Sequence, residues 1–108
     1  MKNVDVHEGK SIAIISYLWW IGLIIAYIMN SNKKNTFASF HIRQMLGLLL
    51  LSVVAGLLRN YVDATLGYII GMASFVLWVI GFIGATKGED KKIPLVGDLF
   101  QDWFKNIG

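Results

Sequence analysis

The sequence predicts an all-α membrane protein with three transmembrane helices and a C-terminal amphipathic helix in the membrane interface. Of the 108 residues, 56% are hydrophobic and the mean hydropathy is +0.58, which is more apolar surface than a soluble domain of this size can bury. The apolar residues also form three long stretches, each separated from the next by a short polar segment. We therefore expect residues 1–108 to form a single integral membrane domain.

The charge pattern argues against nucleic acid as a partner. The formal net charge is +3, but the basic residues lie at the ends of the apolar stretches and form no basic stripe along one face. The chain has no cysteine, so it offers no disulfide, no thiolate metal site and no cysteine nucleophile.

The three expected spans cover residues 11–29, 37–58 and 64–85. The first stretch has no charge over about nineteen residues, which is long enough for a helix to cross a hydrocarbon core of about 30 Å. A hydrophilic turn follows, and Asn35 or Thr36 is the expected N-cap of the second helix. The third stretch is again free of charge.

Small residues recur on one side of the third predicted span. Their spacing of four, three, seven and four places them on one helical stripe, which consists of Gly67, Gly71, Ser74, Gly81 and Ala85. Lipid gives helices no hydrophobic reason to associate, so close approach through small residues drives much of their packing. We expect this stripe to pack the helices into a bundle.

Residues 97–107 have the pattern of a short amphipathic helix. Its apolar side consists mainly of Leu99, Phe100, Trp103 and Phe104, opposite charged and amide side chains. The segment is too short to span a bilayer, so we expect it to lie in the membrane interface and contact lipid. A helix docked on a partner protein is the alternative that the pattern leaves open.

Lysine and arginine near short loops predict the orientation of the chain. With three spans, one side of the membrane carries Lys33, Lys34, Arg43, Lys87, Lys91, Lys92 and Lys105. The other side carries Lys2, Lys10 and Arg59. The sequence therefore predicts an N-terminus outside the cytoplasm and a cytoplasmic C-terminus.

A polar cluster at the start of the second predicted helix is the candidate binding site. His41 and Gln44 are three residues apart and share a helical face, while Arg43 projects elsewhere and can reach headgroups. One hypothesis is a contact site for a partner or for lipid headgroups at the cytoplasmic mouth of the bundle. The alternative is an ordinary interfacial first turn, with Arg43 on lipid phosphates and His41 and Gln44 on backbone groups.

The same residues argue against an enzyme. Acid-base or nucleophilic chemistry needs several groups within hydrogen-bond reach, and His41 has no carboxylate on its own helix. Asp63 is expected at the opposite membrane face, and His7 lacks the second histidine of a metal-binding helix motif. We expect no catalytic residue, no metal site and no cofactor.

Two segments resemble a known family. Residues 30–44, which read NSNKKNTFASFHIRQ, and the later Lys87-Gly88 and residues 93–97, IPLVG, are similar to the bacterial branch of the chloroplast inner-envelope import component family, the Tic-twenty-like proteins. The resemblance implies a multi-pass protein of the bacterial inner membrane and, by analogy, a part in protein translocation. Chloroplast members of that family have four spans and sit in a translocon, whereas this chain shows three.

The sequence thus favours a non-enzymatic interaction protein, an accessory subunit or assembly factor of a larger membrane complex, with a translocase as the partner that the resemblance implies. The alternative is a homo-oligomeric pore or small transporter. Midplane positions are apolar, so only an oligomer could line a pore, for instance through Ser16, Ser52 and Ser74.

Overall fold

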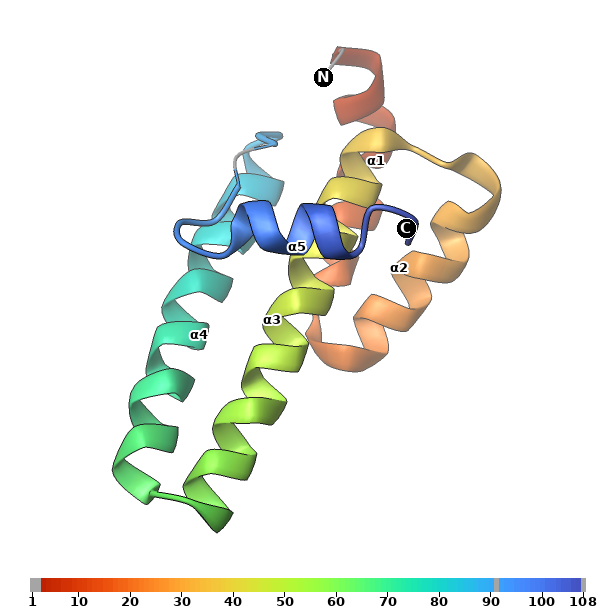
Figure 1. The fold of residues 1–108 in the computed structure, drawn as a ribbon. Helices are drawn as coiled ribbons and strands as arrows, with labels where there is room; N and C mark the ends of the chain where they lie inside the picture. Colours follow the sequence, from red (N-terminus) through yellow and green to blue (C-terminus); the bar gives the residue numbers. More distant parts are fainter. Residues whose placement is uncertain (1–2, 91, 108) are drawn as a thin grey trace.

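The computed structural model describes residues 3–90 and 92–107, and every regular element among them is an α-helix (Figure 1). This agrees with the all-α prediction. In chain order the helices are α1 (Asn3–Ser16), α2 (Trp19–Lys33), α3 (Thr36–Tyr61), α4 (Ala64–Thr86) and α5 (Gly97–Trp103).

The long helices α3 and α4 form an antiparallel hairpin that runs the length of the molecule (Figure 1). Each begins at a side-chain cap: the Asn35 side chain accepts from the Ala38 amide at 3.0 Å, and Asp63 accepts from the Thr65 amide at 3.1 Å. Within the described residues, these two helices are long and apolar enough to cross a membrane. They contain the predicted spans 37–58 and 64–85.

The predicted span 11–29 is not a single helix. The helix breaks at Tyr17 and Leu18, and Trp19 has a positive φ of 63°. The resulting helices have 14 and 15 residues, so each is about 22 Å long and too short to cross a core of about 30 Å. They pack as a second, shorter hairpin, and a side chain at Gly22 would collide with the carbonyl oxygen of Ile15.

The break also determines where α1 and α2 lie along the long hairpin. The turn between α1 and α2 lies about halfway along α3, and the N- and C-termini lie at the same end of the molecule (Figure 1). Val6 of α1 lies beside Gly88, just after α4, which places the start of α1 at the end where α4 finishes. The helices α1 and α2 therefore return the chain to the end of the molecule where it began.

The C-terminal helix α5 lies across α3 (Figure 1) and is shorter than the predicted residues 97–107. Its Phe100 is buried against Gly47 of α3, at a distance that leaves no room for a side chain on the glycine. Phe104 is half-buried beyond the end of the helix, whereas Leu99 and Trp103 are exposed. The helix ends at Trp103, and carbonyls of the segment beyond it bind Arg43, as described below.

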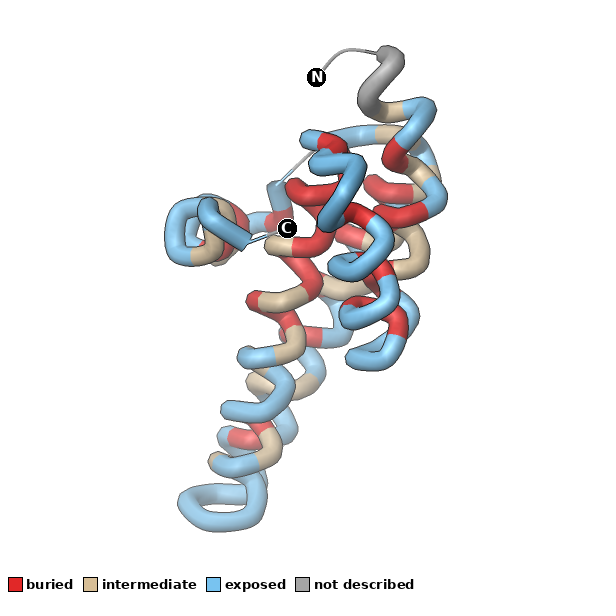
Figure 2. The backbone as a smooth tube through the Cα atoms, turned by 90° about the vertical axis from the view of Figure 1, so that its right-hand side faces the viewer, coloured by how far each residue is buried: buried red, intermediate tan, exposed pale blue. Residues whose placement is uncertain are grey.

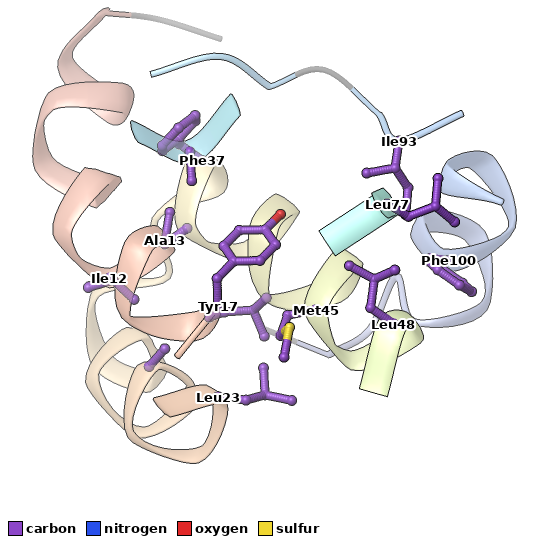
Figure 3. Close-up of a cluster of buried hydrophobic side chains, with 14 residues drawn as sticks. Ile12, Ala13, Tyr17, Leu23, Phe37, Met45, Leu48, Leu77, Ile93 and Phe100 are labelled. Atoms are coloured by element: carbon purple, nitrogen blue, oxygen red, sulfur yellow. The ribbon is translucent and has the colours of Figure 1, made fainter. Parts of the chain in front are cut away.

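Buried residues gather at the end that holds the termini, and the far half of the α3–α4 hairpin is mostly exposed (Figure 2). In the core, the Tyr17 ring points from the α1–α2 turn into the space between the helices, near Met45 and Leu48 (Figure 3). The exposed side chains on the outer faces of α2, α3 and α4 are mainly large and apolar, as expected of surfaces that contact lipid.

The small residues of α4 lie on its packed side. Gly67 is against the backbone of Arg59, and a side chain at Gly81 would meet the Tyr17 ring at 2.9 Å. Ser74 and Ala85 are buried. Gly71 is more open, since a side-chain carbon there would lie 3.9 Å from Ala55 and touch nothing closer.

Candidate functional site

A buried polar cluster of Tyr17, His41 and Gln44 joins the short hairpin to the long one. The Tyr17 hydroxyl lies 2.7 Å from His41 Nδ1 and 3.1 Å from Gln44 Nε2. His41 Nε2 lies 2.8 Å from the carbonyl oxygen of Glu89, and Gln44 Oε1 accepts from the Ile93 amide at 2.7 Å. The cluster therefore connects the α1–α2 turn, α3 and the segment that follows α4.

The hydrogen bonds have one self-consistent direction. Ile93 N–H donates to Gln44, Gln44 N–H donates to Tyr17, and the Tyr17 hydroxyl is left to donate to His41 Nδ1. Because the Glu89 oxygen can only accept, His41 Nε2 carries the other proton. This assignment makes His41 neutral, with its proton on Nε2. A chain of donors aligned in this way strengthens each of its members.

Aromatic rings close the cluster off from the surroundings. The His41 ring has edge-to-face contacts with Phe37 and Phe40, at centroid distances of 4.7 and 5.1 Å. The three residues Tyr17, His41 and Gln44 are fully buried. The side chains of His41 and Gln44 therefore face the protein interior in this structure.

The backbone of the α1–α2 turn is also satisfied by the protein. The break leaves the Tyr17 carbonyl without a helical partner, and the indole N–H of Trp78 on α4 donates to it at 2.9 Å. Ser16 Oγ donates to the Ala13 carbonyl at 2.6 Å, and the Leu18 carbonyl accepts from the Gly22 amide at 3.2 Å. Non-helical backbone at membrane depth is tolerated only where the protein supplies such partners.

Arg43 does not belong to the same cluster. It points to the other side of α3, where Nε donates to the Ile107 carbonyl at 2.9 Å and Nη2 to the Lys105 carbonyl at 2.7 Å. The structure thus brings His41 and Gln44 together and places Arg43 apart from them, holding the C-terminal segment after α5.

Sequence reasoning did not single out Tyr17, Trp78 or Asn30 as members of a polar site. Asn30 is fully buried: its Oδ1 accepts from the Asn35 amide and its Nδ2 donates to Ser39 Oγ, both at 2.9 Å, which closes the loop between α2 and α3. The available signal was a polar tyrosine inside an apolar stretch, since a buried tyrosine hydroxyl usually needs a partner.

Among residues 3–90 and 92–107, no three histidine or acidic side chains gather closely enough to hold a metal ion.

Fold and site together define a helical membrane protein in which a buried polar cluster fastens a short helical hairpin to a long one. The chain belongs to the magnetosome magnetite crystal formation protein family, whose sequence pattern matches residues 7–100.

Two UPF0132 membrane proteins of Methanocaldococcus jannaschii are similar to this chain. One is 30% identical over 84 residues, which cover 74% of this chain and 73% of the relative. The other is 29% identical over 96 residues, which cover 83% of this chain and 65% of the relative, slightly less than two thirds of its length. No solved structure matches the chain.

These comparisons overturn the resemblance to the Tic-twenty-like family. The family match includes both segments on which that resemblance rested, residues 30–44 and 87–97, and nothing in the comparisons points to import components. In the structure the polar residues of the first segment serve the fold, because Asn30, His41 and Gln44 bond internally. The inference of a translocase partner rested on that resemblance and falls with it.

Proposed function

We propose that this protein is a non-enzymatic membrane component that acts through contacts in the bilayer, as an accessory or assembly factor of a larger membrane-bound structure. One observation carries the proposal: the polar atoms of Tyr17, His41 and Gln44 bond to one another and to backbone groups, while the large exposed faces of α2, α3 and α4 are apolar. Polar groups used in this way stabilise the fold, and the apolar faces are left for interactions.

The comparisons support a role in a membrane assembly. The archaeal relatives are described as membrane proteins. The description of the family names the formation of magnetite crystals and names no enzymatic reaction. Both descriptions fit a protein that organises other components.

The arrangement of charges supports a particular topology, in which α3 and α4 cross the membrane and the α1–α2 hairpin enters and leaves on one side. Within the described residues, Arg59 is the one lysine or arginine at the far end of the long hairpin. The end with the termini carries Lys10, Lys33, Lys34, Arg43, Lys87, Lys92 and Lys105. By the positive-inside rule this end, with both termini, faces the cytoplasm.

The same topology places α5 at the cytoplasmic surface of the bilayer. Leu99 and Trp103 are 44% and 64% exposed, and Leu95 just before the helix is 95% exposed. Exposed apolar and aromatic residues beside Lys92 and Lys105 suit the headgroup region of a membrane with anionic lipid.

Single cysteines test the topology, since the chain contains none of its own. Glu8→Cys, Asn60→Cys and Lys105→Cys place a thiol at exposed sites near the N-terminus, in the α3–α4 loop region and near the C-terminus. In intact cells we expect an impermeant maleimide to label position 60 alone. Labelling of position 8 without position 105 would restore the three-span arrangement and contradict this proposal.

Gentle extraction followed by native mass spectrometry tests the role itself. A stoichiometric foreign membrane protein that co-purifies with the chain supports an accessory component. A pure symmetric oligomer that conducts ions after reconstitution contradicts it and supports the pore that the sequence left open.

A further inference from the structure

Directly beneath the α1–α2 turn, the two long helices leave a cavity of about 520 Å³. Its roof is formed by Tyr17 and Trp19 of the turn region. The walls include Leu48 and Ser52 of α3 and Phe75 and Trp78 of α4. The cavity lies where the short hairpin ends, so that beyond it only α3 and α4 continue toward their connecting loop (Figure 1).

The cavity presents an apolar lining, although two serines contribute to it. Ser52 Oγ donates to the Leu48 carbonyl at 3.0 Å and Ser74 Oγ donates to the Ile70 carbonyl at 2.9 Å, so both hydroxyls bond within their own helices. A water molecule in a cavity needs several polar partners, which this lining does not favour. An apolar occupant suits the space better.

Beyond the cavity, the same side of α3 continues toward the far end of the long hairpin. Ser52, Gly56 and Arg59 are spaced four and three residues apart, so they lie on one side of α3. A side-chain carbon at Gly56 would have no neighbour within 4 Å, which leaves the surface of α3 open at that level. At its end the exposed Arg59 guanidinium lies over the Tyr68 ring, 5.6 Å from the centroid.

Resting on the proposed topology, we propose that the cavity and the open surface past Gly56 to Arg59 form a groove that binds one anionic phospholipid of the leaflet at the α3–α4 loop. One acyl chain occupies the cavity and the phosphate lies at Arg59. From Arg59 to Leu49 at the cavity wall, ten residues of helix cover about 15 Å, which is the depth of one leaflet. An arginine at that level complements a phosphate, because its planar group can donate two parallel hydrogen bonds.

Native mass spectrometry of the full chain in mild detergent, titrated with phosphatidylglycerol or phosphatidylcholine, tests the proposal. We expect a one-to-one adduct with phosphatidylglycerol. Ser52→Phe fills the cavity and should lower the affinity at least tenfold, and Gly56→Leu, which fits its open site without collision, should do the same by blocking the groove. Ala73→Phe adds an equal bulk to the exposed outer face of α4 and should leave binding unchanged.

The charge is tested separately. Arg59→Gln should lower the affinity for phosphatidylglycerol about tenfold, to the level of phosphatidylcholine, as expected for the loss of a charge-assisted hydrogen bond. Lys33→Gln removes an exposed charge at the opposite end and should have no effect.

Three results would overturn the proposal. The first is equal loss of lipid in Ser52→Phe and Ala73→Phe, and the second is an Arg59→Gln protein that still prefers phosphatidylglycerol. The third is a dimer without lipid that Gly56→Leu dissociates, which would show that a second copy fills the groove.

Discussion

Removing one oxygen atom from the buried polar cluster should weaken the whole protein. In Tyr17→Phe the ring stays in place, but His41 Nδ1 loses its donor and Gln44 Nε2 loses its acceptor. Hydrogen bonds between helices in membrane proteins contribute about 0.6 kcal/mol on average and about 1.7 kcal/mol at most, whereas a buried group left unpaired costs about 1–3 kcal/mol. The cost of an unpaired buried group applies here, because His41 and Gln44 are both 0% exposed and cannot form hydrogen bonds with water instead.

With two such groups affected, we expect Tyr17→Phe to lower the free energy of unfolding by about 2–3 kcal/mol. The assay is reversible unfolding in mixed micelles of mild and denaturing detergent, followed by tryptophan fluorescence. Tyr27→Phe is the matched control: this tyrosine of α2 is 48% exposed, and its loss of a hydroxyl should change stability by less than about 0.5 kcal/mol. A loss below about 1 kcal/mol for Tyr17→Phe, or one equal to that of the control, would refute the view that this cluster holds the two hairpins together.

Three further pairs of variants test the packing around the cluster, and the same unfolding assay serves the first two. Gly22→Ala forces a methyl group against the Ile15 carbonyl and should cost about 1–3 kcal/mol, whereas Gly56→Ala enters open space and should add up to about 1 kcal/mol of stability. Trp78→Phe leaves the Tyr17 carbonyl unpaired and should cost about 1–3 kcal/mol, while Trp103→Phe, at a residue 64% exposed, should change less than about 0.5 kcal/mol. Arg43→Gln removes both contacts to the last turn, so amide hydrogen exchange at residues 104–107 should become faster, with Arg59→Gln as the control that leaves this exchange unchanged.

The long hairpin could be predicted from the sequence because its signals are local. Asn35 is an N-cap in the structure, one of the two residues expected there, and the two apolar stretches that follow it are the helices α3 and α4. The small residues of α4 could be assigned to one stripe by spacing alone. Each of these inferences needs only a helical period and a segment of chain.

The break at Tyr17 could not be predicted in this way. Residues 11–29 contain no proline and no charge, so nothing within the stretch marks an end to the helix. The groups that stabilise the break come from elsewhere: His41 and Gln44 lie on α3, and Trp78 lies on α4. A tertiary arrangement therefore overrides a local preference for one continuous helix.

For the candidate site too, the sequence predicted what depends on local spacing and missed what depends on distant partners. The spacing of three residues was enough to place His41 and Gln44 on a common inward face. The partners of Arg43 lie more than 60 residues away at Lys105 and Ile107, so the sequence could suggest a lipid phosphate but not the backbone carbonyls that it binds. The position of the His41 proton on Nε2 likewise follows from the carbonyl acceptor at Glu89, which no local pattern marks.

Tyr17 forms hydrogen bonds through both its backbone carbonyl and its side-chain hydroxyl. Together these bonds fix the position of the α1–α2 turn along the long hairpin. Its carbonyl binds Trp78 of α4 and its hydroxyl binds His41 and Gln44 of α3, so the turn can lie only where both helices present those groups. Because the turn forms the roof of the cavity, its depth also fixes how much of the long hairpin remains with only two helices. A shift of the turn by one helical period, about 5.4 Å, would leave the carbonyl and the hydroxyl unpaired and would close or lengthen the cavity. Variants of the polar cluster should therefore alter lipid occupancy at the cavity even though His41 and Gln44 do not line it.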